Sequence, residues 1–388
     1  MLRRLPLGFA GVLITAIAIA ACSSSSATQT ISVGPNFPPQ TLYVTNVTQN
    51  AVSIYSPVPK STGGPIYQIG GSYTTLSGPQ YLTFDSSTNL WVTNWLASTK
   101  AGEILEFKTA ATGNVLPYQT LALGSVRPRG IADFPYTFTG VTTSADVLAV
   151  TVTNPGQPTD FVSGIQFYTA ALLTTPWMIL AGPSTGLNVP SGIAVDKNNN
   201  LYVANLQGQS VTVYAMPSAT PTASPTPTPT ASPTPSPTPT GATASPSPTP
   251  VPTPTPYNVA PIATISGTGS GINQPTGIAL DSAGNIYVSD QASTVCTPDC
   301  PAILVFSPGA NGAQAPMYHI AGAKTLLVAP TDVKVDGSGN IYVADQAAGG
   351  AGIVYVFAPV TSASGSGNVA PIATLNSPGA VIGLGLIP

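Results

Sequence analysis

The chain has 388 residues, only 6% of them charged, and its 13 acidic side chains outnumber its 10 basic ones. Ordinary soluble domains carry roughly 25% charged residues, so the surface here must consist mainly of Ser, Thr, Asn, Gln and Gly. Nucleic-acid binding depends on clustered Lys and Arg, and because no such cluster is visible we expect no nucleic-acid partner.

The N-terminal residues have the layout of an export signal. A basic start precedes an uncharged, largely apolar stretch from Leu5 to Ala21, which is at the short limit for a membrane span. The string Ile19-Ala-Ala-Cys22 closes this stretch and resembles a bacterial lipoprotein signal, in which cleavage precedes a lipid-bearing cysteine. The resemblance implies a signal peptide at 1–21 and lipidation of Cys22. An uncleaved anchor helix is the alternative.

Either form of anchor places the remaining chain outside the cytoplasm. Residues 22–40 then act as a flexible tether between the membrane and the rest of the protein. We expect the protein in the bacterial cell envelope, facing the periplasm or the exterior, with the outer membrane favoured. The membrane is then a partner through the lipid anchor.

From residue 41 to 388 the chain repeats one pattern. Each copy has a first and a second strand, followed by a third and a fourth, all short and rich in β-branched and aromatic residues. Four such strands separated by Gly, Asn, Asp and Pro turns make one propeller blade. The best copies begin Pro190-Ser-Gly-Ile-Ala-Val-Asp196, Pro275-Thr-Gly-Ile-Ala-Leu-Asp281 and Pro330-Thr-Asp-Val-Lys-Val-Asp336, and the weaker ones Pro79-Gln-Tyr-Leu-Thr-Phe-Asp85 and Pro128-Arg-Gly-Ile-Ala-Asp133.

The sixth copy is split between the two ends of this region. Thr41-Leu-Tyr-Val-Thr-Asn46 supplies a second strand with no first strand before it, and Pro378 to Leu386 supplies a first strand with nothing after it. Pairing the two closes a ring and removes the open sheet edge. The sequence therefore predicts an all-β, six-bladed β-propeller of four-stranded blades.

The repeat also resembles the NHL type of six-bladed β-propeller. The shared signature is Pro-x-Gly-[Ile/Val]-Ala-[Val/Leu]-Asp followed by Gly-Asn-[Ile/Leu]-Tyr-Val-[Ala/Ser]-[Asp/Asn], which the last three blades match best. The chain lacks the Arg that often follows in the third strand of that family. The resemblance therefore supports the fold more than any family ligand.

Two polar positions recur once per blade, and we interpret both as turn caps. The first set ends the first strands and comprises Asp85, Asp133, Asp196, Asp281 and Asp336; the second ends the second strands and comprises Asn46, Asn94, Asn154, Asn205, Asp290 and Asp345. In the second set Asp290 and Asp345 are carboxylates where the other blades have Asn. They are the first candidates for a cation such as Ca²⁺; otherwise we expect no cofactor.

Aromatic and cysteine residues give further expectations. The second-strand aromatics Tyr43, Trp91, Tyr202, Tyr287 and Tyr342 are expected to pack between blades rather than to bind carbohydrate. Trp95 is expected in a loop, as an exposed contact residue. Cys296 and Cys300 favour a local disulfide over a metal or redox site, because a metal would need two further soft ligands.

The stretch 217–256 is almost wholly Pro, Thr, Ser and Ala and is expected to be a disordered, polyproline-like insertion. It falls between the third and fourth strands of blade four. In a four-stranded meander that position shares one face with both chain ends. We therefore expect ligands on the opposite face, whose longest loops are Trp95–Gly102, Pro155–Ser163, Cys296–Cys300 and Ala347–Gly352.

No catalytic set can be assembled from the sequence. The one histidine, His319, falls in an outermost strand, and Glu103 and Glu106 are expected to be exposed on a third strand. We therefore expect a monomeric binding or scaffold module for a protein or an envelope glycan. A metal-dependent, lactonase-like or lyase-like propeller enzyme is the alternative.

Overall fold

The structure is a computed structural model that describes residues 37–138, 143–153, 163–170, 175–216, 256–347, 350, 352–361 and 367–387. The predicted signal peptide, Cys22, most of the tether, Asn154 and residues 217–255 lie outside this part. The described helices are the short 3₁₀ turns η1 (Pro183–Thr185), η2 (Thr268–Ser270) and η3 (Ala323–Thr325). No helix within the described ranges is long and apolar enough to cross a membrane.

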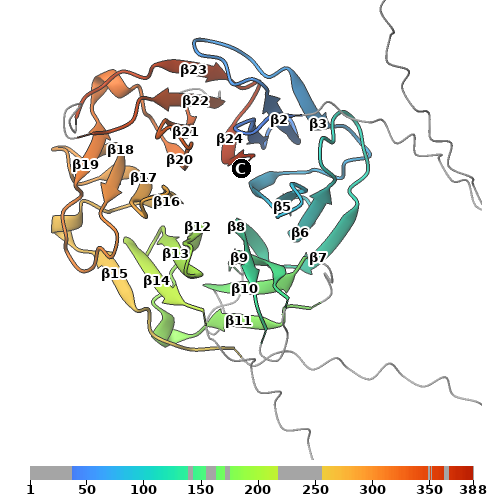
Figure 1. Ribbon diagram of the computed structural model, residues 1–388, viewed down its shortest axis with the longest axis horizontal. Coiled ribbons are helices and arrows are strands. Elements are labelled where there is room, and N and C mark those ends of the chain that lie inside the picture. The colour runs from blue at the N-terminus through green and yellow to red at the C-terminus, as the bar shows by residue number, and fades with distance from the viewer. Residues whose placement is uncertain are drawn as a thin grey trace, which may run out of the picture. The chain divides into compact units, whose positions relative to one another are not determined.

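The strands form six antiparallel sheets of four strands each (Figure 1). Blade 1 contains β24 (Val381–Leu386), β1 (Leu42–Asn46), β2 (Ala51–Tyr55) and β3 (Tyr67–Gly70), and blade 2 contains β4 (Pro79–Phe84), β5 (Leu90–Leu96), β6 (Ala101–Phe107) and β7 (Gln119–Gly124). Blade 3 contains β8 (Arg127–Tyr136), β9 (Ala145–Thr153), β10 (Ser163–Thr169) and β11 (Met178–Ala181), and blade 4 contains β12 (Pro190–Val195), β13 (Asn200–Asn205), β14 (Ser210–Ala215) and β15 (Ala263–Ser266). Blade 5 contains β16 (Pro275–Leu280), β17 (Ile286–Ser293), β18 (Cys300–Phe306) and β19 (Tyr318–Ala321), and blade 6 contains β20 (Pro330–Val335), β21 (Ile341–Gln346), β22 (Gly352–Phe357) and β23 (Ala373–Asn376).

The ring closes as the split repeat predicted. β24 pairs with β1, with Leu386 opposite Leu42 and Leu384 opposite Val44. The first strands of neighbouring blades contact each other around the axis, and Figure 1 shows β8, β12, β16 and β20 near the centre and β7, β11, β15 and β19 at the outside. The six-bladed propeller fold is thus confirmed.

The register of the strands defines two faces of the ring. The chain enters β1 at Leu42 and leaves β24 at Leu386. On the same side β14 ends at Ala215, which pairs with Asn200 at the turn between the first two strands of its blade. We call this side the tether face. The side on which second strands end, for example at Asn205, is the opposite face.

The core lies between blades, where each sheet buries its β-branched and aromatic side chains. Tyr43, for example, packs edge-on against Phe84 of the next blade at 4.9 Å between ring centroids. All five second-strand aromatics are buried, in agreement with the packing interpretation. Burial of so much aromatic surface at each contact is a large stabilising contribution.

The outer edges of the blades are also covered. In five places a segment that connects the third and fourth strands of one blade makes a parallel bridge to the fourth strand of the preceding blade, as with Tyr257 and Leu180. In four blades an Asn in that segment, such as Asn258 or Asn368, accepts a backbone N–H. The donor lies in the fourth strand of the preceding blade or just after it. Such coverage blunts exposed strand edges, which otherwise promote aggregation.

Blade 3 departs from the predicted register. The repeat placed Asp133 at the end of the first strand, but β8 continues to Tyr136 and Asp133 pairs with Leu148 in mid-strand. Its copy of the motif is one residue short, so Asp133 occupies the position of Val195 in blade 4, which pairs with Leu201. The prediction that Asp133 caps a turn is therefore wrong.

Candidate functional site

The axis of the propeller is lined by the third residue of each first-strand motif. Gly130, Gly192 and Gly277 stand at this position, and the strand register places Gly383 of blade 1 there too, whereas blades 2 and 6 have Tyr81 and Asp332. A Cβ on Gly192 would lie 2.8 Å from the Cα of Gly277, and one on Gly383 would lie 2.6 Å from the Cα of Tyr81. The first strands therefore approach closely wherever this residue has no side chain.

Tyr81 extends from blade 2 across the axis to the far blades. Its hydroxyl lies 3.1 Å from the Oγ of Ser191, 3.3 Å from the carbonyl oxygen of Thr276 and 3.0 Å from that of Thr331. Burial, and next the Asp332 carboxylate, raise the pKa of the Tyr81 phenol, against smaller opposing effects of Ser191 and Arg129. The phenol is therefore neutral and acts as a hydrogen-bond donor that links four blades.

Asp332 is the second exception, and it is buried beside the axis. Its carboxylate accepts backbone N–H groups of Val333 and Leu384 at 2.9 Å and pairs with Lys334 at 3.3 Å. Burial raises the pKa of Asp332, and the Lys334 charge and the hydrogen bonds oppose that shift. Neither residue was predicted from the sequence, although each stands where other blades have Gly, and that difference is a signal that could have identified both.

The first repeated set is engaged in turn capping. Asp281 accepts the backbone N–H groups of Ala283 and Asn285 at 2.9 Å through Oδ1. Its Oδ2 accepts the Asn285 amide at 2.8 Å and the Tyr287 hydroxyl at 3.2 Å. The same four bonds recur, with Trp or Tyr as the aromatic donor, at Asp85, Asp196 and Asp336.

The candidate cation residues Asp290 and Asp345 lie in separate blades and are fully buried. Asp290 accepts backbone N–H groups of Asn273 at 2.8 Å and of Gln274 at 3.1 Å, and Asp345 accepts that of Val328 at 3.0 Å. Burial raises the pKa of both carboxyls, and these bonds oppose the shift. Within the described ranges no group of three or more His, Cys, Asp and Glu side chains is placed to hold a metal.

These contacts lead to a prediction about metal dependence. Because the oxygens of Asp290 and Asp345 already accept N–H donors, a cation there would have to displace them. We expect the melting temperature of purified residues 23–388 to be the same, within about 1 °C, in chelator and in added Ca²⁺. Thermal melts with elemental analysis test this. A stoichiometric metal and a lower melting temperature in chelator would contradict it.

The opposite face carries the remaining predicted contact residues. Trp95 was expected in a loop, but β5 continues through Leu96 because Trp95 pairs with Gly102 of β6. Its side chain is half-buried, and the guanidinium of Arg127 lies over its ring, 5.8 Å from the centroid. The prediction of an exposed loop residue is thus wrong.

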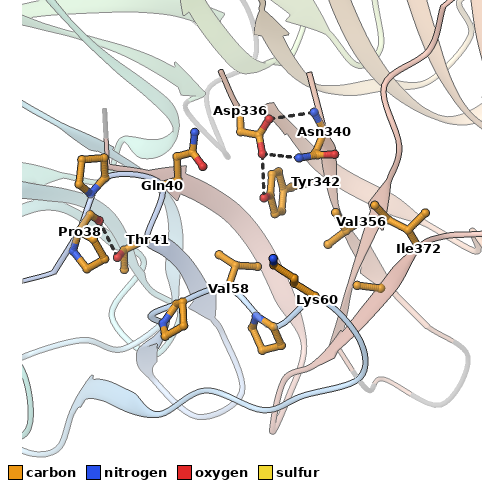
Figure 2. A pocket seen from close by; sticks show the side chains of 14 residues that line it. Pro38, Gln40, Thr41, Val58, Lys60, Asp336, Asn340, Tyr342, Val356 and Ile372 are labelled. Atoms are coloured by element: carbon orange, nitrogen blue, oxygen red, sulfur yellow. Dashed lines mark hydrogen bonds between the residues drawn. The ribbon is translucent and has the colours of Figure 1, made fainter. Parts of the chain in front are cut away.

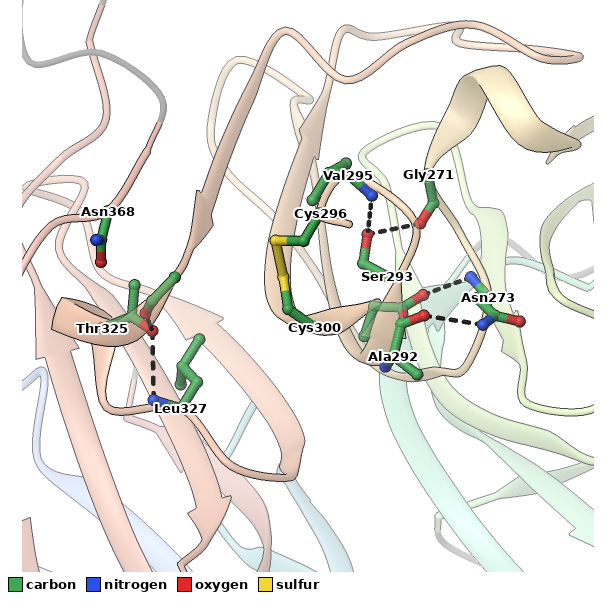
Figure 3. Close-up of a disulfide and its surroundings, with 12 residues drawn as sticks. Gly271, Asn273, Ala292, Ser293, Val295, Cys296, Cys300, Thr325, Leu327 and Asn368 are labelled. Atoms are coloured by element: carbon green, nitrogen blue, oxygen red, sulfur yellow. Dashed lines mark hydrogen bonds between the residues drawn. A yellow bond between two sulfur atoms is a disulfide. The ribbon is translucent and has the colours of Figure 1, made fainter. Parts of the chain in front are cut away.

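The loop of blade 5 on this face contains a disulfide between Cys296 and Cys300 (Figure 3). Ser293, at the start of the loop, donates a hydrogen bond to the Gly271 carbonyl at 2.6 Å, and Asn273 donates one to Ala292 at 2.9 Å. The loop is therefore held against the connection between blades 4 and 5. Closing so short a loop stabilises by about 2 kcal/mol in the loop-entropy model.

Glu106 was expected to be exposed, but only 1% of it is accessible. It forms an ion pair with Lys108 and accepts a hydrogen bond from Gln119 at 2.7 Å. Strand alternation alone did not reveal that these two neighbours cover it.

A pocket of about 420 Å³ lies where blades 1 and 6 meet (Figure 2). Its apolar lining includes Pro38, Val58, Val356 and Ile372. Polar side chains come from the turn of blade 6, where Asp336 accepts hydrogen bonds from Asn340 and Tyr342, and from Gln40, Thr41 and Lys60. The pocket adjoins the residues that lead into β1, so it is on the tether face rather than on the face where we expected ligands.

Comparison with known proteins supports the fold alone. No family model and no curated protein match the chain. A protein of unknown function from Bacteroides caccae is 10% identical over 90% of this chain and 99% of that chain, with a TM-score of 0.52. A protein from Lactobacillus plantarum is 10% identical over 90% and 100% of the two chains, with a TM-score of 0.45. Virginiamycin B lyase from Staphylococcus aureus is 11% identical over 86% of each chain, with a TM-score of 0.39. The first of these similarities supports the fold, and at 10% identity it carries no statement about function.

Proposed function

We propose that this chain is a lipid-anchored, extracytoplasmic propeller that binds a protein or an envelope glycan through its opposite face, without catalysis. The observation that carries the proposal is that the side chains at the axis and the repeated polar side chains form hydrogen bonds within the propeller itself. Tyr81 fills the axis with bonds to three other blades, and the repeated carboxylates cap turns. These groups serve the scaffold, which leaves the loops of the rim for recognition.

The opposite face suits that role. Its loops include the disulfide-closed segment of blade 5 and the Trp95 hairpin. The chain is nearly uncharged, so electrostatic steering contributes little to association. An abundant or co-localised partner therefore fits better than a dilute charged one.

A pull-down from envelope extract tests the proposal with purified residues 23–388 and two variants. One variant lacks residues 217–255, and the other has the Cys296–Cys300 loop replaced by a short Gly-Ser turn. We expect the first variant to retain its partner and the second to lose it, with both melting cooperatively. The reverse pattern would overturn the assignment of binding to the opposite face.

The membrane anchor has a test of its own. Replacing Cys22 with serine removes the only atom that could accept the lipid at the proposed cleavage point. We expect C22S to move from the membrane fraction to the soluble fraction after cell disruption, while the unmodified chain partitions into detergent. If the C22S protein stays in the membrane fraction after alkaline carbonate washing, an uncleaved anchor helix explains the attachment instead.

A further inference from the structure

Two arginines lie together at the opposite-face end of the axis. Arg127 and Arg129 flank Pro128 at the start of β8, an innermost strand. Arg129 stands next to the axial glycine position of its blade, and its charge acts on the Tyr81 hydroxyl. Both side chains are half-buried. The pair therefore places two positive charges close to each other at the opposite-face end of β8.

Among the described residues, these guanidinium groups have few partners. The Nε atoms of both are buried without a hydrogen bond. Arg127 donates to the Gln80 Oε1 at 3.2 Å and lies over Trp95. The ion pairs in the described part of the chain join Lys108 to Glu106 and Lys334 to Asp332, so neither arginine has a carboxylate there.

Two like charges with no carboxylate partner among the described residues are unfavourable in a partly desolvated place. Burial, and next the charge of Arg129, lower the pKa of Arg127. The carboxylate of Glu103, on the adjoining β6, is occupied by a hydrogen bond from the Asn94 amide at 3.1 Å. The pair is therefore a concentrated positive site in a chain that is otherwise nearly uncharged and slightly acidic.

We propose that Arg127 and Arg129 form a binding site for a single carboxylate group on an otherwise neutral ligand. A guanidinium presents paired N–H donors that match the two oxygens of a carboxylate, and this geometry favours a bidentate contact. The contacts given for Arg127 are with neutral groups, the side-chain amide of Gln80 and the indole of Trp95. These surroundings suit one negative charge on a polar body, and not a polyanion, which needs an extended basic surface.

This site rests on the proposed binding function and gives it a ligand chemistry. A carboxylate of this kind is available from two sources, a uronic acid of an envelope glycan or the C-terminus of a peptide. Both present the same group to the arginines. The probes are therefore glucuronate with glucose as its neutral match, and N-acetylalanine with its amide as the corresponding match.

Titration calorimetry or ligand-observed NMR on the ectodomain measures these probes. We expect glucuronate, N-acetylalanine or both to bind, the neutral matches to bind at least tenfold more weakly, and Arg127→Gln and Arg129→Gln each to weaken binding at least tenfold. Lys197→Gln, at an exposed residue of the turn between β12 and β13 on the tether face, is the matched control and should bind as the unmodified chain does. Binding of glucuronate alone would assign the glycan source, and binding of N-acetylalanine alone the peptide source.

Two results would overturn the site. The first is that neither acid binds more tightly than its neutral match. If the envelope pull-down still succeeds in that case, the arginine site is rejected and the proposed function stands.

The second result concerns Asp160, the acidic residue of the segment between β9 and β10. If Asp160→Asn and Arg127→Gln lower the melting temperature equally and non-additively, the arginine serves an internal ion pair. We expect the ligand-free Arg127→Gln protein to melt at or above the unmodified chain, because like-charge repulsion is relieved.

Discussion

Replacing Tyr81 with alanine will lower the free energy of unfolding by about 3–5 kcal/mol, the range for removing a large buried aromatic side chain. Tyr81 is 6% exposed and is the side chain that extends across the axis to Ser191, Thr276 and Thr331. Its loss leaves a cavity where the first strands converge and removes a bond shared by blades 4, 5 and 6. Urea denaturation followed by fluorescence or circular dichroism measures the change.

Two variants separate the ring from the hydroxyl. Tyr81→Phe keeps the aromatic volume and removes the donor, so it should cost about 1–3 kcal/mol. Tyr73→Ala alters a tyrosine that is 59% exposed and should change stability by about 0.5 kcal/mol or less. If Tyr81→Ala is as stable as Tyr73→Ala, the axis does not depend on this side chain.

Asp133→Asn will raise the free energy of unfolding at pH 8 by about 2 kcal/mol and remove part of the dependence of that free energy on pH. Asp133 lies in mid-strand with its Oδ1 buried and without a hydrogen bond. Burial, then Asp146 and then Asp85, raise its pKa from 3.8 to about 8. A shift of that size corresponds at 1.36 kcal/mol per unit to about 5–6 kcal/mol, of which we expect less than half after partial solvation.

The sign of the effect follows from proton linkage. Below about pH 4 this carboxyl is protonated in both the folded and the unfolded chain, so it does not contribute to the pH dependence of the free energy of unfolding. Between about pH 4 and pH 8 the unfolded chain releases the proton while the folded one keeps it, and stability therefore falls as pH rises. Denaturation curves at pH 5 and pH 8 measure this fall.

The exposed residue Asp299 provides a matched control for Asp133. Asp299→Asn should keep the pH dependence of the unmodified chain, whereas Asp133→Asn should lose much of it. If the free energy of unfolding changes equally between pH 5 and pH 8 in all three proteins, Asp133 is ionised in the folded state near neutral pH, against the expectation from its burial.

The features that the sequence predicted well are those that occur once per blade. Asp281 with Asn285 and Tyr287 forms a turn that is made again in three other blades, so the repetition itself exposed its role. The split repeat likewise revealed the pairing of β1 with β24, because each half lacks what the other supplies.

The features that the sequence did not reveal occur only once. Tyr81 matters because ring closure brings residues 110 to 250 positions away in sequence to its hydroxyl, and no local pattern encodes that approach. Asp133 was misplaced because its motif lacks one residue, which shifts a strand register in which neighbouring side chains face opposite ways. The arginine pair was visible in the sequence, but the lack of a carboxylate partner among the described residues was not.

The position of β1 within its blade bears on how the molecule carries force. β1 is bonded on one side to β24 and on the other to β2, so the strand that follows the tether is an inner one. The hydrogen bonds of an antiparallel pair run perpendicular to the strands. Tension applied along β1 from the proposed membrane anchor is therefore resisted by two rows of bonds loaded in shear at once. Extraction of that strand requires their concerted rupture, so a pull on the N-terminal side of β1 is borne by the whole closing blade.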